Sequence, residues 1–384
     1  MPYLRNSDQN KKISIYLPNL TGLRFVAALM VFVCHVESVK EIFNIPNLAE
    51  NFFFINIGKL GVLVFFVLSG YLITYLLLRE ESSTAKVDIK KFYLRRILRI
   101  WPLYFLIVIF GLYAAPYSSF FHLPNFLSAL SGNNTTQISL LFFFFLPNYV
   151  YAAFGGVPYA VQTWSVGTEE QFYLVWPWLI KKIKNKTLLF PAVFIVYNII
   201  KIVLIALQHR APAIKALLDF WYYFNIDCMA LGAVAAYFVI TKNEKILKII
   251  FSIAAQLITY ITIIILIGFA VIFRYFHFEI YGFFFTIAIA NLAANKKSIL
   301  NLENKIFNYM GKISYGIYMY HLIALTIALR ILIRLNFLNN VAIYLLGFII
   351  TIILSSLSYF YFESYFLKLK NRFSIFSNKK QPVV

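Results

Sequence analysis

Hydrophobic residues gather in long runs along the chain, and short polar segments separate these runs. A run of roughly twenty apolar residues has the length that a helix needs to cross about 30 Å of hydrocarbon at about 1.5 Å per residue. Inside a bilayer every backbone polar group must be satisfied within the chain, so such runs predict helices. We predict ten spanning helices, over residues 20–39, 57–79, 97–116, 168–182, 188–207, 221–241, 246–267, 278–294, 313–332 and 341–364.

One further apolar stretch, residues 138–153, is short and is interrupted by Pro147 and Asn148. Proline removes a helix donor and clashes with the preceding turn. If this stretch does not cross and the N-terminus is cytoplasmic, most Lys and Arg residues fall in cytoplasmic loops, which is the positive-inside pattern. If it crossed, every later loop would change sides and this bias would be lost. We therefore predict an all-α, polytopic membrane helical bundle with both termini cytoplasmic and residues 138–153 as a re-entrant or interfacial element facing outward.

The organisation expected from these runs is simple. Residues 1–19 form a polar cytoplasmic segment without the apolar core of a removable signal peptide. Residues 20–366 form a single transmembrane domain, and residues 367–384 form a short basic cytoplasmic tail. We find no internal repeat, and we expect no appended soluble domain within these residues.

Composition and charge agree with a membrane protein. The 384 residues are 61% hydrophobic and only 13% charged, and their mean hydropathy is +0.76, whereas a soluble domain is about a quarter charged. The net charge of +20 does not indicate nucleic-acid binding, because the basic residues lie in short loops between apolar runs. Cys34 and Cys228 both lie in apolar runs, so neither a disulfide nor a metal site is expected.

The first predicted helix carries two ionisable residues, Arg24 and His35, which are eleven positions apart. Eleven steps of about 100° return almost to the same helix face, about 16 Å further along. Ionisable groups within a membrane usually face a polar interior, so the pair is a candidate site. The alternative is that His35 is an interfacial histidine hydrogen-bonded to a neighbouring helix. Cys34 points to another face, where packing is its expected role.

Two further segments combine charge with apolar surroundings. Arg95, Arg96 and Arg99 open the third predicted helix, and guanidinium groups bind phosphate oxygens well. The alternative for this cluster is contact with lipid headgroups. Glu169 and Glu170 lie at the start of the fourth predicted helix, where the helix dipole suits one acid better than two.

Three other positions have mainly structural interpretations. Thr168 and Gln171 have the spacing of a capping box at the start of the fourth helix. Gly70, with Ser69 before it, favours close helix packing in the second helix. His321, in the segment that opens the ninth helix, is either a second functional group or a hydrogen-bonded structural histidine.

Taken together, these motifs resemble the membrane acyltransferase-3 family, bacterial enzymes that acylate glycans and other extracytoplasmic or lipid-linked acceptors. The resemblance runs from about Leu17 to Phe366. It rests on five elements in the family's order: Arg24 with His35, Gly61-Val62 to Ser69-Gly70-Tyr71, Arg95-Arg96-x-x-Arg99 with Pro102 and Tyr104, Trp164-Ser165 to Glu169-Glu170-Gln171-Phe172-Tyr173, and Ser314-Tyr315 leading to His321.

The resemblance implies roles for these residues. It makes His35 the catalytic histidine and Arg24 its partner, with Glu169 and Glu170 as the family's acidic pair. It assigns Arg95, Arg96, Arg99 and Tyr104 to binding of the acyl-CoA donor at the cytoplasmic face. Many relatives have a polar residue where Leu63 stands, so no acceptor contact is expected there. Within these 384 residues we expect no extracytoplasmic hydrolase-like domain of the kind that some members carry.

The expected function is transfer of an acyl group, by default acetyl, from cytoplasmic acetyl-CoA across a bacterial inner membrane. The acceptor is a hydroxyl of an extracytoplasmic or lipid-linked glycan, His35 is the general base, and no metal is required. A covalent acyl-histidine step is the main variant. The alternative classes are a transporter or flippase for an anionic lipid-linked substrate, which would often show internal repeats, and an enzymatically silent scaffold. The partners expected are therefore acyl-CoA, a glycan acceptor and membrane lipid, not nucleic acid.

Overall fold

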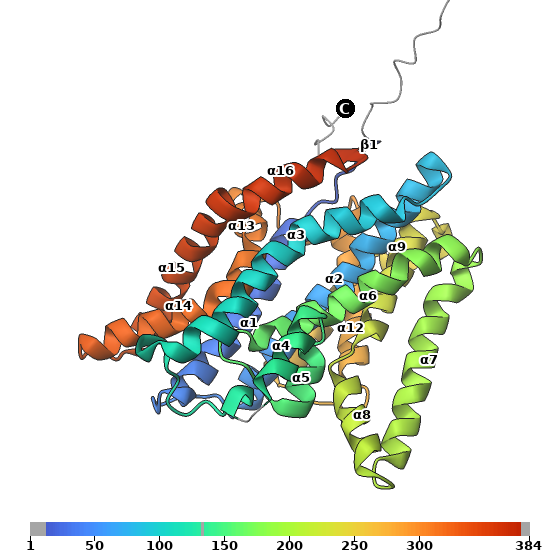
Figure 1. Cartoon of the computed structure of the whole chain (residues 1–384). Coiled ribbons are helices and arrows are strands. Elements are labelled where there is room, and N and C mark those ends of the chain that lie inside the picture. Colours follow the sequence, from blue (N-terminus) through green and yellow to red (C-terminus); the bar gives the residue numbers. More distant parts are fainter. Residues whose placement is uncertain (1–12, 132–133, 378–384) are drawn as a thin grey trace, which may run out of the picture.

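The computed structural model of the chain describes residues 13–131 and 134–377. The α-helices form one elongated bundle (Figure 1). They are α1 (Leu20–Ile42), α2 (Phe52–Thr84), α3 (Ile89–Ile109), α4 (Thr135–Phe143), α5 (Pro147–Phe154), α6 (Trp164–Lys182), α7 (Lys186–Leu207), α8 (Pro212–Tyr222), α9 (Ile226–Ile240), α10 (Glu244–Ile250), α11 (Ile253–Gly268), α12 (His277–Ala294), α13 (Lys305–Lys312), α14 (Ser314–Arg334), α15 (Asn340–Leu357) and α16 (Ser364–Arg372).

Short elements complete the described part of the chain. Two π-helical turns continue α3 and α15, at Phe110–Ala114 and Ser358–Glu363. Single 3₁₀ turns lie in the connections, at Ala115–Tyr117, Ser119–Phe121, Ala129–Ser131 and Val161–Thr163. Strand β1 (Ile13–Ser14) pairs in parallel with β2 (Phe376–Ser377), so the two ends of the described chain meet at one end of the bundle, which we call the terminal face (Figure 1).

The predicted membrane-spanning helices are confirmed as helices. Within the described ranges, eight helical segments are long and apolar enough to cross a membrane, and the bent pair α10–α11 raises this number to nine. The remaining predicted span is α6, which is too polar for the same criterion because it carries Glu169, Glu170, Lys181 and Lys182. The pairing of β1 with β2 at one end requires an even number of crossings. The described residues thus support eight or nine spans by length and composition, and the predicted ten is reached only when α6 is added.

Residues 138–153 do not form one long helix, as the sequence indicated. They divide between α4 and α5, and Phe145 in the break has a positive φ of 59°. Pro147 is the first residue of α5, a position where its missing N–H costs nothing. The side chain of Pro147 packs against Gly167 of α6, so this broken segment is held against the bundle.

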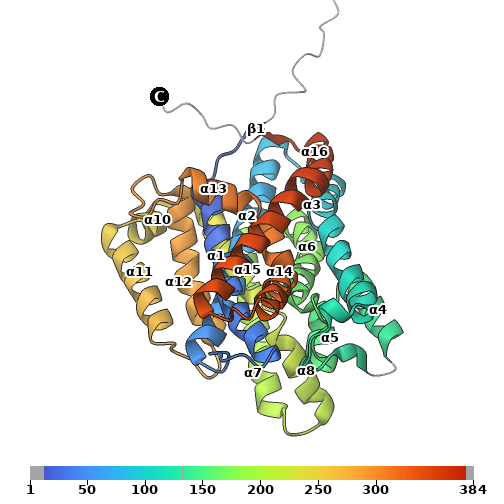
Figure 2. The same ribbon diagram turned by 90° about the vertical axis from the view of Figure 1, so that its left-hand side faces the viewer.

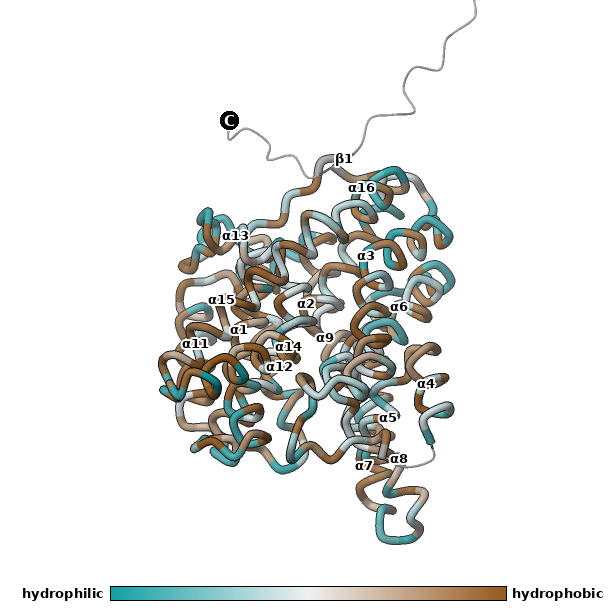
Figure 3. The backbone as a smooth tube through the Cα atoms, turned by 60° about the vertical axis from the view of Figure 1, so that its left-hand side comes forward, coloured by the Kyte–Doolittle hydropathy of each residue, from teal (hydrophilic) through white to brown (hydrophobic). Residues whose placement is uncertain are grey.

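Large apolar side chains are exposed in stripes on the outer helices. In α11 and α15 an exposed apolar side chain recurs at every third or fourth residue. Examples are Ile258, Ile261 and Ile265 in α11 and Leu345 and Ile349 in α15. Hydrophobic stretches predominate along the helices, and hydrophilic ones are frequent in the connecting segments (Figure 3). Exposed apolar area of this extent is expected where lipid rather than water surrounds the helices.

Helix α2 occupies the centre, packed against both α1 and α9. Gly70 of α2 and Gly232 of α9 allow the second contact, because a side chain at either position would overlap the backbone of the facing helix. On its other side, Gly58 of α2 lies against the sulfur of Cys34 in α1. The packing roles predicted for Gly70 and Cys34 are therefore confirmed.

The C-terminal helix α16 lies across the terminal face and packs against α3 (Figure 2). It begins in the last residues of the predicted transmembrane domain and continues into the predicted basic tail, which starts at residue 367. Its residues therefore lie next to the first turns of α3, where the arginine motif is found.

Candidate active site

Five cationic side chains gather near the terminal face, and we call them the cationic cluster: Arg24 of α1, Arg95, Arg96 and Arg99 of α3, and Lys370 of α16. The ammonium of Lys370 lies within electrostatic range of all four arginines. Helix α3 begins at Ile89, so its three arginines lie six to ten residues into the helix. Its N-cap is Asp88, whose side chain accepts a hydrogen bond from the backbone N–H of Lys91. That hydrogen bond lowers the pKa of the Asp88 carboxyl below its usual value.

The cationic cluster is poorly neutralised by the protein. Arg95 forms an ion pair with Glu80, with 3.1 Å between Nη2 and Oε2, and its Nη1 donates to the carbonyl of Phe373. In the described part of the chain, the other four members are in no ion pair within 4.0 Å. The buried Nε of Arg96 has no hydrogen-bond partner there either. Like charges held together in this way attract an anion, and guanidinium groups suit phosphate oxygens.

The predicted acidic pair, Glu169 and Glu170, lies beside this cluster in the second turn of α6. The carboxylate of Glu169 accepts a hydrogen bond of 2.6 Å from Tyr173, and it interacts electrostatically with Arg24 and Arg96. The carboxylate of Glu170 accepts a hydrogen bond of 2.9 Å from the indole of Trp101. The two acids therefore have different hydrogen-bond partners, but both interact electrostatically with Arg96 of the cationic cluster.

The predicted capping box of Thr168 and Gln171 is wrong. Helix α6 begins earlier, at Trp164, so both residues lie inside it. The hydroxyl of Thr168 donates to the carbonyl of Tyr223, and the amide of Gln171 donates to the carbonyl of Phe145. The two side chains hold the neighbouring segments against α6 instead of capping it.

His35 lies in the half of α1 away from the terminal face, and its ring is partly exposed. Its Nδ1 lies 2.7 Å from Nε2 of His321 in α14. His321 is 1% exposed, and its Nδ1 lies 2.7 Å from the carbonyl oxygen of Tyr318. The two histidines, which the sequence offered as separate candidates, thus form one pair between helices that pack against each other.

A chain of polar side chains connects the histidine pair with the cationic cluster. Arg24 interacts with Glu169, and Glu169 interacts with the hydroxyl of Tyr318. The Tyr318 and His321 rings are 6.0 Å apart between centroids. Ser165 lies on the same path, with 2.7 Å between its hydroxyl and that of Tyr318. Because apolar packing is the default inside such a bundle, a polar series of this length marks a functional interior.

Tyr104, also predicted to bind the donor, is fully buried. Its hydroxyl donates to the carbonyl of Phe142 at 2.8 Å, and its ring stacks on Phe145. The residue lies near Glu170. It therefore holds the segment between α4 and α5 against α3, and no contact of its side chain with the cationic cluster is seen.

Three residues of this region, Tyr173, Tyr318 and Lys370, were not predicted from the sequence to take part in the site. Tyr173 follows Glu169 by four residues, the spacing of neighbours on one helix face, and Tyr318 precedes His321 by three. These signals were present in the quoted motifs. Lys370 had no such signal, because only the folding of α16 onto α3 brings it to the arginines.

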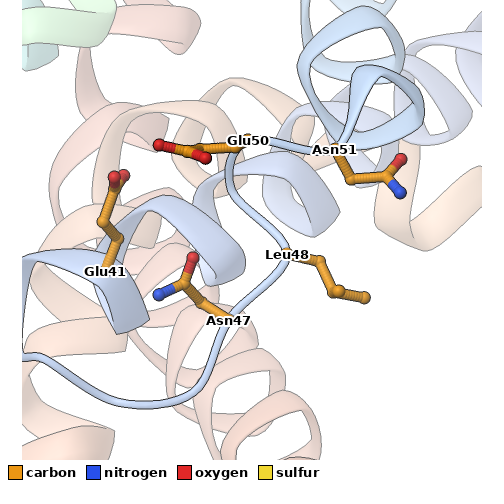
Figure 4. Close-up of a pocket in the computed structure, with 5 residues that line it drawn as sticks. All are labelled: Glu41, Asn47, Leu48, Glu50 and Asn51. Atoms are coloured by element: carbon orange, nitrogen blue, oxygen red, sulfur yellow. The ribbon is translucent and has the colours of Figure 1, made fainter.

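A separate pocket of about 400 Å³ opens in the connection between α1 and α2 (Figure 4). It is lined by Glu41, Asn47, Leu48, Glu50 and Asn51. It contains none of the candidate residues discussed above.

Comparison with known proteins agrees with the resemblance seen in the motifs. A family profile described as an acyltransferase domain matches residues 17–360. The chain is 34% identical to the peptidoglycan O-acetyltransferase OatA of Listeria monocytogenes over 186 residues, which are 46% of this chain and 27% of that protein. It is 26% identical to the O-acetyltransferase OatA of Staphylococcus aureus over 380 residues, 91% of this chain and 57% of that protein.

The aligned part of the chain therefore covers little more than half of the length of the Staphylococcus aureus protein and about a quarter of the length of the Listeria monocytogenes protein. No solved structure matches it significantly. The family profile nevertheless covers all five motifs, from Arg24 to His321, and nearly the whole helical bundle. The chain belongs to the acyltransferase-3 family of membrane-embedded acyltransferase domains.

Proposed function

We propose that the protein transfers an acyl group, by default acetyl, from cytoplasmic acyl-CoA to a hydroxyl group of an extracytoplasmic or lipid-linked glycan. The observation that carries this proposal is the polar chain between the cationic cluster and the histidine pair. It joins a site suited to an anion with a site suited to proton transfer. The name of the Listeria monocytogenes relative favours peptidoglycan as the acceptor class.

The donor fits the cationic cluster. Coenzyme A carries several phosphate charges on its nucleotide, whereas its pantetheine arm is narrow and uncharged. The nucleotide would bind Arg96, Arg99 and Lys370, which have no carboxylate within ion-pair distance among the described residues. The arm would then extend along α1 from Arg24 to His35, a helical rise of about 16 Å.

The chemistry assigned to His35 is general-base catalysis, and histidine is the side chain whose ordinary pKa lies closest to neutrality. The imidazole accepts the proton of the acceptor hydroxyl as its oxygen attacks the thioester carbonyl. The new carbon–oxygen bond forms, the carbon–sulfur bond breaks, and coenzyme A leaves as a thiolate that takes the proton from the imidazolium. A hydroxyl or amide donor near the thioester must stabilise the oxyanion. The candidate hydroxyl groups on the polar chain are those of Ser165 and Tyr318, of which Tyr318 donates to the carbonyl of Gln162 in this structure.

The acidic pair has a supporting role in this scheme. Glu169 interacts with Arg24 and Arg96, so it orients two cations of the donor path. Glu170 is held by Trp101 and has one buried oxygen without a hydrogen-bond partner in the described residues. That oxygen is available to a hydroxyl group of the acceptor or to an ordered water.

Transfer of radiolabelled acetyl from acetyl-CoA to peptidoglycan fragments in proteoliposomes tests the proposal directly. The intact protein should transfer label, and His35→Ala should lose transfer almost completely while inserting normally. His277→Gln is the control, because His277 is a half-buried histidine of α12 that is bonded to Asn56 and is not a member of the polar chain. Near-normal transfer by His35→Ala would exclude His35 as the base. Movement of an unmodified lipid-linked substrate without any label transfer would identify a flippase instead.

A further inference from the structure

The pairing of His35 with His321 assigns hydrogen positions to both rings. The carbonyl oxygen of Tyr318 can only accept, and it lies 2.7 Å from Nδ1 of His321. Nδ1 of His321 must therefore carry a hydrogen and donate it. In a neutral imidazole the other nitrogen is then an acceptor, so Nε2 of His321 presents its lone pair to His35.

The same reasoning extends to His35. Nδ1 of His35 lies 2.7 Å from Nε2 of His321, a hydrogen-bond distance. Since Nε2 of His321 is the acceptor, Nδ1 of His35 must carry a hydrogen and donate it. The rings are nearly parallel, with 15° between their planes and 4.8 Å between their centroids. Because the facing nitrogens are much closer than the centroids, the rings meet edge to edge, which is the geometry of a hydrogen bond through ring nitrogens.

The consequence concerns the remaining nitrogen of His35. With its hydrogen on Nδ1, the neutral ring has a free lone pair on Nε2. Within the described ranges, Nε2 of His35 makes no hydrogen bond, and His35 as a residue is half-buried rather than fully buried. This is the nitrogen that can accept a proton from a substrate.

The opposite arrangement would need a charged His321. If both nitrogens of His321 carried hydrogens, Nε2 of His321 would donate to Nδ1 of His35. The hydrogen of a neutral His35 would then lie on Nε2 of His35, and that nitrogen could accept no proton from a substrate. A cation at a position that is 1% exposed is costly without a counter-charge. Among residues 13–131 and 134–377, the one titratable group that acts on His321 electrostatically is His35, and no carboxylate of these ranges does so.

We infer that His321 is a positioning residue that holds His35 in the tautomer whose Nε2 accepts the proton of the acceptor hydroxyl. This inference rests on the proposed function of His35. In other enzymes, replacing the residue that fixes the tautomer of a catalytic histidine lowers the reaction rate strongly. The wrong tautomer presents a hydrogen instead of a lone pair to the substrate proton.

Two amide side chains provide a matched test. In His321→Gln the terminal oxygen can reach the place of Nε2 and accept from His35, whereas His321→Asn has the same amide on a chain one methylene shorter and cannot. His321→Leu removes the acceptor altogether. Acetyl transfer, the KM for acetyl-CoA and thermal stability would be measured for all three in proteoliposomes, beside His35→Ala.

We expect His321→Gln to keep kcat within about tenfold of the wild-type value, and His321→Asn and His321→Leu to lose about 10²-fold or more, with the KM for acetyl-CoA unchanged. Equal losses in the Gln and Asn variants of normal stability would overturn the inference, as would full activity in His321→Leu. If instead His35→Ala remained active, the proposed function would fail, and this result differs from the pattern that would reject His321 alone.

Discussion

Gly70 of α2 lies directly against the backbone carbonyl of Met229 in α9, so closely that a β-carbon at position 70 would overlap the carbonyl oxygen. The contact lies at the centre of the bundle, where α2 and α9 pack over their length. The preceding residue, Ser69, lies close to Glu169 and Tyr173 on another side of α2. Helix packing and site geometry thus depend on two adjacent residues.

Gly70→Ala should therefore destabilise the protein by about 1–3 kcal/mol, because the new methyl group forces two backbones apart in a packed interior. Thermal unfolding in detergent micelles would measure the effect as a lower Tm. Gly268→Ala is the matched control, since nothing lies within 4 Å of a β-carbon there. Equal Tm values for the two variants would show that α2 and α9 are not held in this close contact.

The salt dependence of donor binding tests the cationic cluster. Arg96→Gln and Arg99→Gln should each weaken acetyl-CoA binding by about tenfold or more, because a charge-assisted hydrogen bond contributes about 1.5–3 kcal/mol. Added salt should weaken binding to the wild-type protein more than to either variant. Titration of acetyl-CoA into protein in nanodiscs at two salt concentrations measures both effects, and unchanged affinity in both variants would reject this donor site.

Lys201 and Glu279 form a buried ion pair away from the polar chain, with 2.5 Å between Nζ and Oε1 and side-chain exposures of 4% and 6%. Lys201→Met should cost about 3–5 kcal/mol, because it leaves a carboxylate buried without its partner. The double variant Lys201→Met/Glu279→Leu should recover much of that loss, since neither charge remains. A double-mutant cycle of Tm values provides the measurement, and a double variant as unstable as the sum of the single ones would contradict a direct coupling.

Much of this architecture was predictable from the sequence because a bilayer imposes strict length and polarity rules. Eight of the ten predicted runs are continuous helical segments, whereas 221–241 is broken between α8 and α9 and 246–267 is bent between α10 and α11. The interruption at Pro147 separates α4 from α5 as expected. The packing role of Gly70 also followed from its residue type. The start of α6 was not predicted, since Thr168 and Gln171 have a capping pattern that their tertiary partners override.

The composition of the site was predictable only in part. Arg24, Glu169 and His35 all lie along the polar chain, whereas Tyr104 bonds a backbone carbonyl of α4. The link between His35 and His321 joins residues 286 positions apart, and no local pattern encodes such a contact. Periodicity reveals which face of a helix a residue occupies, but not which other helix that face will meet.

The last prediction concerns Lys370, the member of the cationic cluster that only tertiary structure reveals. Lys370 is half-buried against the arginines, whereas Lys368, two residues earlier on α16, is exposed. If Lys370 binds a phosphate of the donor, Lys370→Ala should raise the Kd for acetyl-CoA by about tenfold, and Lys368→Ala should leave it nearly unchanged. Lys370→Ala should also relieve repulsion among like charges, so its Tm without donor should not fall. A weaker affinity for acetyl-CoA together with a lower Tm would instead indicate that Lys370 stabilises the packing of α16 against α3. Equal effects of Lys370→Ala and Lys368→Ala on affinity would show that Lys370 acts only through the general charge of the surface.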